Sequence, residues 1–330
     1  MNLPDYFLAD LPAEATLDAT TISEGCRALK HNRDRYLAGR STQSLIAVLS
    51  GLAESWLAPD YPFRRLALQA GPDTTGFSAA TLAAGLDAFF SQLTSDNLHG
   101  LLQQELGHVQ RLDRFVATSG EHQGQRTALA TGPRLLVHIA AGNLPCPTLM
   151  SMVFGLLVRS GQFVKCATGA ARLPRLFAHS LYEIEPKLGA CLEIAEWKGG
   201  RPDLEMALHA EADCLTATGS DETLAEIRRH LPSHVRFLGY GHRVSFGYIA
   251  HEVLSSHGAK KIAALAAADV IAWDQLGCLS PHLFYVEHGG AVSPELFAEM
   301  LATELAKREE TEPRGNIAVA EAAAINSRRA

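Results

Sequence analysis

The residues with the clearest chemical potential lie in AADVIAWDQLGCLSPHLFYVE, residues 267–287, where one cysteine stands between two apolar runs. The Ala-rich run before Cys278 predicts a helix, and the short run after it predicts a strand. A thiolate is a strong nucleophile and a good leaving group, so it can accept an acyl group from a thioester and release it again. The role of Cys278 therefore depends on the elements around it.

The other five cysteines fit a structural role better. Cys166, Cys191 and Cys214 fall in predicted strands and Cys26 in a predicted helix, where a thiol behaves as a small buried apolar group. Cys146 lies in the turn NLPCP and is expected to line the wall of a site rather than to react. The six cysteines form no CxxC pair, as in proteins of a reducing compartment.

Two further features could take part in chemistry. His282 lies four residues after Cys278 and could act as its base, although a residue in a strand after a turn is expected to face elsewhere. The segment HEVLSSH, residues 251–257, lacks the spacing of a HExxH zinc helix. We therefore predict no metal.

The composition is that of an ordinary globular protein, with 330 residues, 47% hydrophobic and 20% charged residues and a net charge of -7. Lys and Arg form no dense run, so we predict no nucleic-acid binding. Residues 136–158 are long enough to cross a bilayer, but Asn143, Pro145 and Pro147 interrupt them, so no membrane span is predicted. The segment MNLPDYFLADLPAE carries no signal-peptide pattern, and we expect a cytoplasmic protein.

Apolar spacing predicts helices through residues 21–117 and an alternation of strands and helices from residue 133. Short strands without a polar face are typical of a parallel sheet covered by helices on both sides. The expected strands are RLLVHIA, QFVKCA, CLEIAEW, DCLTATG and HVRFLGY. The sequence thus predicts an α/β fold with a doubly wound parallel sheet.

Ligands of such sheets bind beyond the carboxyl ends of the strands. The strand end TATGSDE has the strongest physical case, because Gly219 lets the backbone turn closely and Ser220 opens a helix whose free N–H groups suit a phosphate. An ordinary Ser N-cap would explain the same residues. No GxGxxG follows the first strand, so the usual dinucleotide fingerprint is absent.

The order of these motifs resembles one family. The sequence GNLPCP, a strand ending in Lys, TGS at a helix start, a Gly-rich turn and a Cys after DQ are similar, in this order, to the aldehyde dehydrogenase superfamily. DQLGCLSPH, HIAAGNLP and EPRGNIAVAEAAAI most resemble the LuxC family of acyl-CoA reductases. The resemblance covers about residues 130–330. It implies a dinucleotide-binding domain at residues 131–247 and a catalytic domain at residues 248–330; the helical N-terminal part at residues 1–130 matches only in general character, and we expect it to pack on the dinucleotide-binding domain.

The resemblance also assigns roles to individual residues. It implies that Cys278 is the nucleophile and that the Asn143 amide helps to hold the oxyanion. It implies further that Lys165 meets the adenosine ribose of a nicotinamide cofactor, and that Gly219 and Ser220 meet its pyrophosphate. The implied activity is the reduction of an acyl thioester, either acyl-CoA or acyl-protein, to an aldehyde through an S-acyl cysteine.

Two departures from the superfamily pattern refine this expectation. The turn FLGYGHRVSFGYI has no acid where aldehyde-oxidising members carry the Glu that activates water, which favours a thioester reductase over a hydrolytic dehydrogenase. Thr168 stands where members that use NAD carry a Glu, and Lys165 with Arg172 adds positive charge, so we predict NADPH in preference to NADH. The alternative is that Thr168 only begins a turn and that Arg172 is a solvated charge.

The superfamily's catalytic domain continues much further past the Cys, whereas this sequence ends at INSRRA, so we expect a fragment with a truncated catalytic domain. A full-length protein would be a homo-oligomer and could receive its acyl group from an acyl-transferring protein partner. The alternative function is a non-catalytic acyl-binding or scaffolding subunit. A Cys-His hydrolase fits least, because no acid or amide supports the pair at a recognisable spacing.

Overall fold

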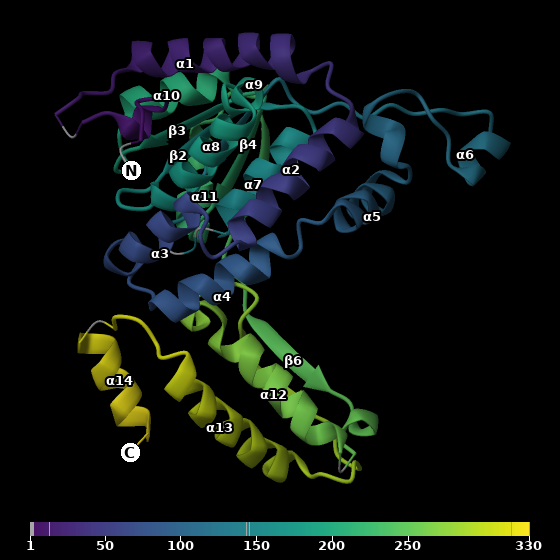
Figure 1. The fold of residues 1–330 in the computed structure, drawn as a ribbon, viewed down its shortest axis with the longest axis vertical. Helices are drawn as coiled ribbons and strands as arrows, with labels where there is room; N and C mark the ends of the chain where they lie inside the picture. The colour runs from purple at the N-terminus through teal and green to yellow at the C-terminus, as the bar shows by residue number, and fades with distance from the viewer. Residues whose placement is uncertain are drawn as a thin grey trace. The chain divides into compact units, whose positions relative to one another are not determined.

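The computed structural model describes residues 3–12, 14–142, 144, 146–255, 257–317 and 319–329. Contacts divide the chain into two units that are interleaved along the sequence. The first unit comprises Met1–Ala67 and Asp87–Gly241, and the second comprises Leu68–Leu86 and His242–Ala330. Figure 1 shows the elements of both.

The first unit is built on a five-stranded parallel sheet with the strand order β3-β2-β1-β4-β5. Its strands are β1 (Leu135–Ile139), β2 (Gly161–Cys166), β3 (Leu192–Glu196), β4 (Cys214–Thr218) and β5 (Arg236–Tyr240). β2 is buried along its whole length and β1 nearly so, which is why neither segment alternates polar and apolar residues, although His138, Gln162 and Lys165 are buried within them. The direction of strand addition reverses between β1 and β4, which makes this the switch point where doubly wound sheets bind ligands.

The helices precede the sheet in the chain or connect its strands. In order they are α1 (Ala19–Asn32), α2 (Thr42–Leu57), α3 (Pro62–Thr75), α4 (Ala79–Phe90), α5 (Ser95–Leu106), α6 (Ser119–Gln123), α7 (Cys146–Leu157), α8 (Arg172–Ile184), α9 (Pro186–Gly189), α10 (Pro202–Glu211) and α11 (Asp221–His230). Polar N-caps explain several of their starts, because a side-chain oxygen accepts the backbone N–H three residues on. Asp18, Ser41, Thr94 and Ser220 act in this way.

Helices cover both faces of the sheet. On one face, α1 and α10 lie side by side and pack with Val137, Phe163 and Leu215 of the strands (Figure 1). Side chains alternate along a strand, so Gln162 faces the opposite side, where its amide donates to the Met152 carbonyl of α7. α8 packs beside α7 and contacts β3. The predicted doubly wound sheet is confirmed, and α1 forms one of its covering layers.

The N-terminal segment is fastened to the edge strand β3. A short 3-10 helix, η1 (Leu8–Asp10), lies against β3, and the Leu8 N–H donates to Glu193 Oε1 at 2.7 Å. The Ile194 N–H donates to the same oxygen at 3.0 Å. Burial raises the pKa of Glu193 to about 7. This carboxyl group therefore holds the start of the chain on the sheet.

The second unit contains a two-stranded parallel sheet of β6 (Ser245–Ile249) and β7 (Pro281–Val286). After His242 its helices are α12 (Gly258–Ile271), α13 (Pro294–Thr311) and α14 (Val319–Arg329), and the segment Leu68–Leu86 adds the end of α3 and most of α4. One face of the sheet packs with α12 and α13 around Phe297 and Ala263. On the other face Phe246 and Tyr248 are 61% and 65% exposed, and Tyr285 is 55% exposed.

Strand β6 was not expected, because the sequence GYGHRVSFG, residues 239–247, is interpreted as a Gly-rich turn. Gly247 interrupts the apolar alternation that would have revealed a strand. The structure gives the reason for that glycine: a Cβ at Gly247 would lie 2.3 Å from the Phe284 ring of β7. The close approach of the two strands therefore excludes a side chain here.

Candidate active site

The carboxyl ends of the strands carry most of the residues that the sequence indicated. Lys165 lies in β2 and Thr168 follows it, while Gly219 and Ser220 follow β4. β1 lies between these strands, so the segment after β1 belongs to the same edge of the sheet. Asn143 lies outside the described residues, and its role stays a prediction.

A buried polar chain ties β1 to both of its neighbours near this edge. The Gln162 oxygen accepts a hydrogen bond from His138 Nε2 at 2.9 Å. The other ring nitrogen, Nδ1, lies 2.7 Å from the Thr216 hydroxyl. Burial lowers the pKa of His138 to about 4, so the imidazole is neutral at physiological pH. The chain therefore joins β2, β1 and β4 without adding charge.

Lys165 is nearly buried and has hydrogen-bonding capacity to spare. Its side chain faces the α1 and α10 side of the sheet, where the ammonium nitrogen lies 5.5 Å from the centre of the Trp197 ring. Burial lowers its pKa, and the nearby carboxylate of Glu205 opposes the shift. In the described part of the chain this ammonium donates no hydrogen bond. Such a group suits an oxygen-rich ligand.

The turn after β2 displays Thr168 to solvent and is held by a residue that sequence reasoning missed. Glu196, at the end of β3, accepts the Gly169 N–H at 2.8 Å and the Ala171 N–H at 3.2 Å, one with each carboxylate oxygen. Gly169 has a φ of +82°, which a glycine adopts without strain. The pairing of β2 with β3 brings Glu196 to this turn, and that pairing spans too much sequence for a local pattern to reveal it.

Arg172 does not have the position that we expected. Its guanidinium Nη2 is directed at the Leu66 carbonyl oxygen at 3.4 Å, and burial lowers its pKa. This side chain is therefore engaged with α3 rather than displayed as free charge beside Thr168. Of the two cations expected to attract a 2'-phosphate, only Lys165 remains. The carboxylate of Glu196, at the same turn, disfavours a phosphate.

The segment after β4 contains the predicted helix cap, Ser220, and Gly219 directly before it. Ser220 is the N-cap of α11 and its hydroxyl accepts the Thr223 N–H at 3.3 Å. Gly219 has no left-handed backbone, and a Cβ there would meet Thr223 only at 3.5 Å, an ordinary contact. The contacts of the turn itself would therefore admit a side chain at Gly219, and its contact with a pyrophosphate stays a prediction. Glu222 in the first turn already uses its own backbone N–H and the Ser220 hydroxyl, which lowers its pKa.

Cys278 lies in the second unit, in an exposed turn between η5 (Ala272–Gln275) and β7. Three consecutive residues before it, Trp273, Asp274 and Gln275, have left-handed backbones with φ of 54°, 52° and 67°. Each such non-glycine residue costs about 1–2 kcal/mol. The Ser245 hydroxyl donates to the Cys278 carbonyl at 2.5 Å. The turn thus presents the thiol outward at an energetic cost that its surroundings must offset.

In the described part of the chain, no hydrogen bond joins His282 to the Cys278 thiol. The pairing of β6 with β7 skips His282, which forms a bulge between Pro281 and Leu283. Of the described residues, none forms a hydrogen bond to the Cys278 thiol. Any role of His282 as a base for Cys278 stays a prediction.

The remaining cysteines are buried, as predicted for Cys26, Cys166, Cys191 and Cys214. Burial raises the pKa of Cys26, Cys166 and Cys191 to about 12, and it raises that of Cys214 as well. Cys146 begins α7 and is also buried, with its pKa raised to about 12. Thiols that stay protonated cannot compete with an exposed one as nucleophile.

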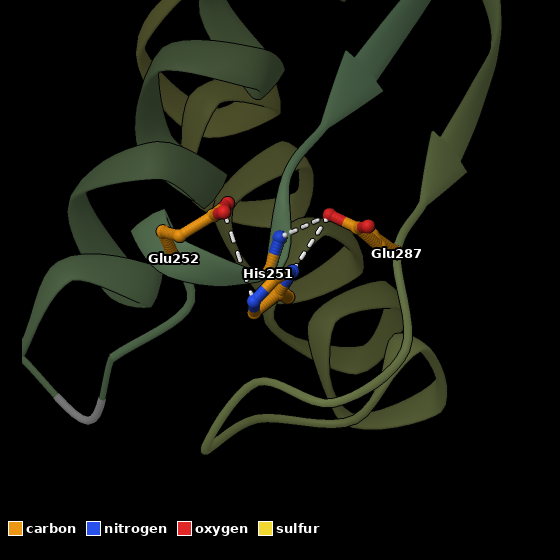
Figure 2. Close-up of side chains that lie close together, drawn as sticks. All are labelled: His251, Glu252 and Glu287. Carbon is orange, nitrogen blue, oxygen red and sulfur yellow. Dashed lines mark hydrogen bonds and ion pairs between the residues drawn. The ribbon is translucent and has the colours of Figure 1, made fainter.

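One group in the described part of the chain brings metal-ligand atoms together: His251, Glu252 and Glu287, within 4.8 Å of one another (Figure 2). The His251 Nδ1 and its backbone N–H lie 2.8 and 2.9 Å from Glu287 Oε2, and Nε2 lies 3.7 Å from Glu252. The bond to Glu287 raises the pKa of His251, and the bonds from His251 lower that of Glu287. An ion pair that joins the ends of β6 and β7 explains this group. The absence of a metal stays a prediction.

Solved aldehyde dehydrogenases share this fold. The NAD-dependent aldehyde dehydrogenase from Sinorhizobium meliloti is similar with a TM-score of 0.66 at 12% identity, over 92% of this chain and 56% of that one. The chain therefore has an aldehyde dehydrogenase-like fold, as its motifs indicated. In the described part, no helix combines the length and apolar character that crossing a membrane requires.

The family model of the acyl-CoA reductases (LuxC) matches residues 37–330, and the chain belongs to this family. It is 23% identical over 255 residues to the long-chain acyl-protein thioester reductase of Vibrio harveyi, covering 76% of this chain and 51% of the relative. The enzyme of the same description from Aliivibrio fischeri is 22% identical over 290 residues, covering 85% and 57%. The chain spans about half the length of these relatives.

Proposed function

We propose that this chain carries the cofactor-binding sheet and the nucleophile of a reductase that converts an acyl thioester to an aldehyde. The observation that carries the proposal is Cys278, an exposed thiol in a strained turn, in a chain of the acyl-CoA reductase family whose other cysteines are buried. The relatives named as long-chain acyl-protein thioester reductases favour a long acyl group carried by a protein or by coenzyme A. An acyl-transferring protein would then be a partner, and the cytoplasm the compartment.

In the proposed reaction, the Cys278 thiolate attacks the thioester carbonyl, the oxyanion is held by the Asn143 amide, and the donor thiol leaves with the electron pair of the broken C–S bond. NADPH, when bound, supplies the hydride that reduces the acyl carbonyl. The Cys278 thiolate then departs from the reduced carbon and frees the aldehyde. Lys165, Thr168, Gly219 and Ser220 would hold the cofactor. The nearly buried Lys165 ammonium with unused donors and the Ser220 N-cap fit its oxygen-rich groups.

No carboxylate occurs in residues 227–251, where a base for water would be needed, which supports reduction over hydrolysis. The charge argument for NADPH over NADH rests on Lys165 and on the hydroxyl at Thr168, since Arg172 is engaged elsewhere. NADPH remains our proposed cofactor, with NADH as the alternative.

The test is to incubate the protein with a long-chain acyl-CoA, with and without NADPH, and to locate the acyl group by peptide mass spectrometry. We expect the adduct on Cys278, its loss in Cys278→Ala, and NADPH oxidation matched by aldehyde. Cys146→Ala is the control and should keep the adduct; an adduct on Cys146 would refute the assignment. Acylation without NADPH oxidation would instead indicate the alternative, an acyl-binding or scaffolding subunit.

A further inference from the structure

We propose that Asp274 is a positioning residue for the nucleophile, because it holds the strained turn that presents Cys278. The proposal rests on the function proposed above and adds a residue to it. It concerns contacts that all lie within the second unit.

The turn needs outside support. Trp273, Asp274 and Gln275 are consecutive left-handed residues, and an indole-bearing residue in this conformation is a clear outlier. Such a backbone persists only where neighbouring groups determine it. Cys278 follows three residues later, so the direction of the turn decides where its thiol lies.

Asp274 supplies the support through its side chain and its backbone. Its carboxylate Oδ2 accepts the Gly315 N–H at 3.0 Å, and its carbonyl oxygen accepts from Arg314 Nη2 at 3.2 Å. Both donors belong to the extended segment 313–317, which lies 40 residues further along the chain from Asp274. The turn is thus held by a distant segment rather than by its own sequence.

That segment is itself fixed. The Asn316 N–H donates to the Gly76 carbonyl at 2.7 Å, and a Cβ at Gly315 would lie 2.0 Å from the same oxygen. Only glycine therefore allows the approach of residue 315 to the 76–77 backbone. Phe77 also contacts the Trp273 ring edge-on, with 5.3 Å between ring centres. The segment that binds Asp274 is thus bonded to Gly76, and the next residue, Phe77, packs against Trp273.

The function of the Asp274 carboxylate is then to accept a hydrogen bond, not to exchange protons. Loss of the acceptor releases the turn and misplaces the thiol, whereas an amide oxygen in the same place accepts the same N–H. Asn also adopts the left-handed conformation readily. Misplacement of a reacting group by about 1 Å costs about 10²-fold in rate.

The experiment compares Asp274→Ala, Asp274→Asn, Gly315→Ala and the matched control Asp269→Asn, which removes a charge from the exposed face of α12. The single-turnover rate of acyl transfer from acyl-CoA to Cys278 is expected to fall about 10- to 100-fold in Asp274→Ala and in Gly315→Ala. Asp274→Asn and Asp269→Asn should stay near the wild-type rate. Steady-state KM for the cofactor should not change in any variant.

Reaction with a disulfide reagent that releases a coloured thiol is measured alongside, because it requires no acyl substrate. Folded protein should show one reactive thiol and denatured protein six, which reports folding in each variant. Wild-type acylation in Asp274→Ala, an Asn variant as slow as the Ala variant, or additional reactive thiols in Asp274→Ala would each overturn the inference. If wild-type protein accepts no acyl group, the proposed function fails, and an altered rate of Cys278 with the reagent in Asp274→Ala but not in Asp274→Asn still upholds the positioning role.

Discussion

A thiol is an efficient nucleophile only when other groups favour its deprotonation and stabilise the oxyanion that forms on the carbonyl it attacks. Cys278 is exposed and no described residue bonds to its sulfur, so the surrounding protein contributes mainly direction. The five buried thiols show the opposite situation, because burial raises their pKa values and keeps them protonated. The remaining requirement is a donor for the developing oxyanion, which an uncharged amide can meet.

Replacement of Asn143 by Ala tests that donor. We expect kcat to fall about 10²- to 10³-fold, as when one oxyanion donor is removed, with the fold intact. Measurements of kcat and of the melting temperature on the same preparation distinguish this from a structural role. If stability falls in proportion to activity, Asn143 instead satisfies backbone groups in the turn beside Pro145.

At the scale of elements, we propose that the turn between β2 and α8 determines which cofactor can approach the sheet. Glu196 uses both of its oxygens on backbone N–H groups of this turn, so its negative charge is partly neutralised there. Thr168 remains exposed in this turn. We therefore expect a substituent at residue 168 to change the contacts of a bound cofactor.

We expect the wild type to have a higher kcat/KM with NADPH than with NADH, and Thr168→Glu to shift that ratio toward NADH by at least about tenfold, since a carboxylate beside a phosphate is repelled. Glu196→Gln serves as the control. It weakens the support of the turn and should raise KM for both cofactors alike, leaving their ratio unchanged. A wild-type preference for NADH, or a ratio that Thr168→Glu does not alter, would contradict the charge argument.

The elements themselves were predictable because their signals are local. The bounds of α11 and the five strands of the large sheet follow from apolar runs and from Ser220 as a cap. Glu196 and Asp274 could not be assigned roles in the same way, because their partners Gly169 and Gly315 reach them through pairing and packing across the chain. The sequence also does not reveal whether a turn requires its glycine, and a Cβ at Gly219 would make only an ordinary contact with Thr223.

At the scale of the whole molecule, the helix layer and the edge of the large sheet are each held by contacts between segments that are distant in sequence. α1 joins α10 through ion pairs of Arg27 and Lys30 with Glu211, and η1 joins β3 through Glu193. The stability of the first unit therefore depends on contacts between its beginning and its middle. One of these contacts is sensitive to pH.

The pKa of Glu193 is raised to about 7 from 4.5, so the folded state favours the protonated carboxyl. Its contribution to stability is present below about pH 4.5 and is lost as pH rises through 7. At pH 8 the cost is at most about 3 kcal/mol. Glu193→Gln keeps an oxygen for both N–H donors and stays neutral.

We therefore expect Glu193→Gln to match the wild type in urea unfolding at pH 5 and to exceed it in stability at pH 8. The comparison of the two chains at each pH cancels every other titrating group. Parallel stability curves from pH 5 to pH 8 would show that Glu193 is not held protonated by the fold.

The interleaving of the two units also has a consequence for how the chain acquires its structure. The first unit cannot be completed until the chain has been made as far as Gly241, because its strands then become available to pack against the helix at Ala19–Asn32. The segment Leu68–Leu86 can pack only later, because the residues that it contacts lie beyond His242. Contacts of such long sequence separation form slowly, since a large loop must close before they stabilise anything. During synthesis, the N-terminal helices emerge long before the strands that they cover, with their apolar faces still unpaired. The slow step of folding should accordingly be the docking of α1 onto the finished sheet rather than the formation of any helix.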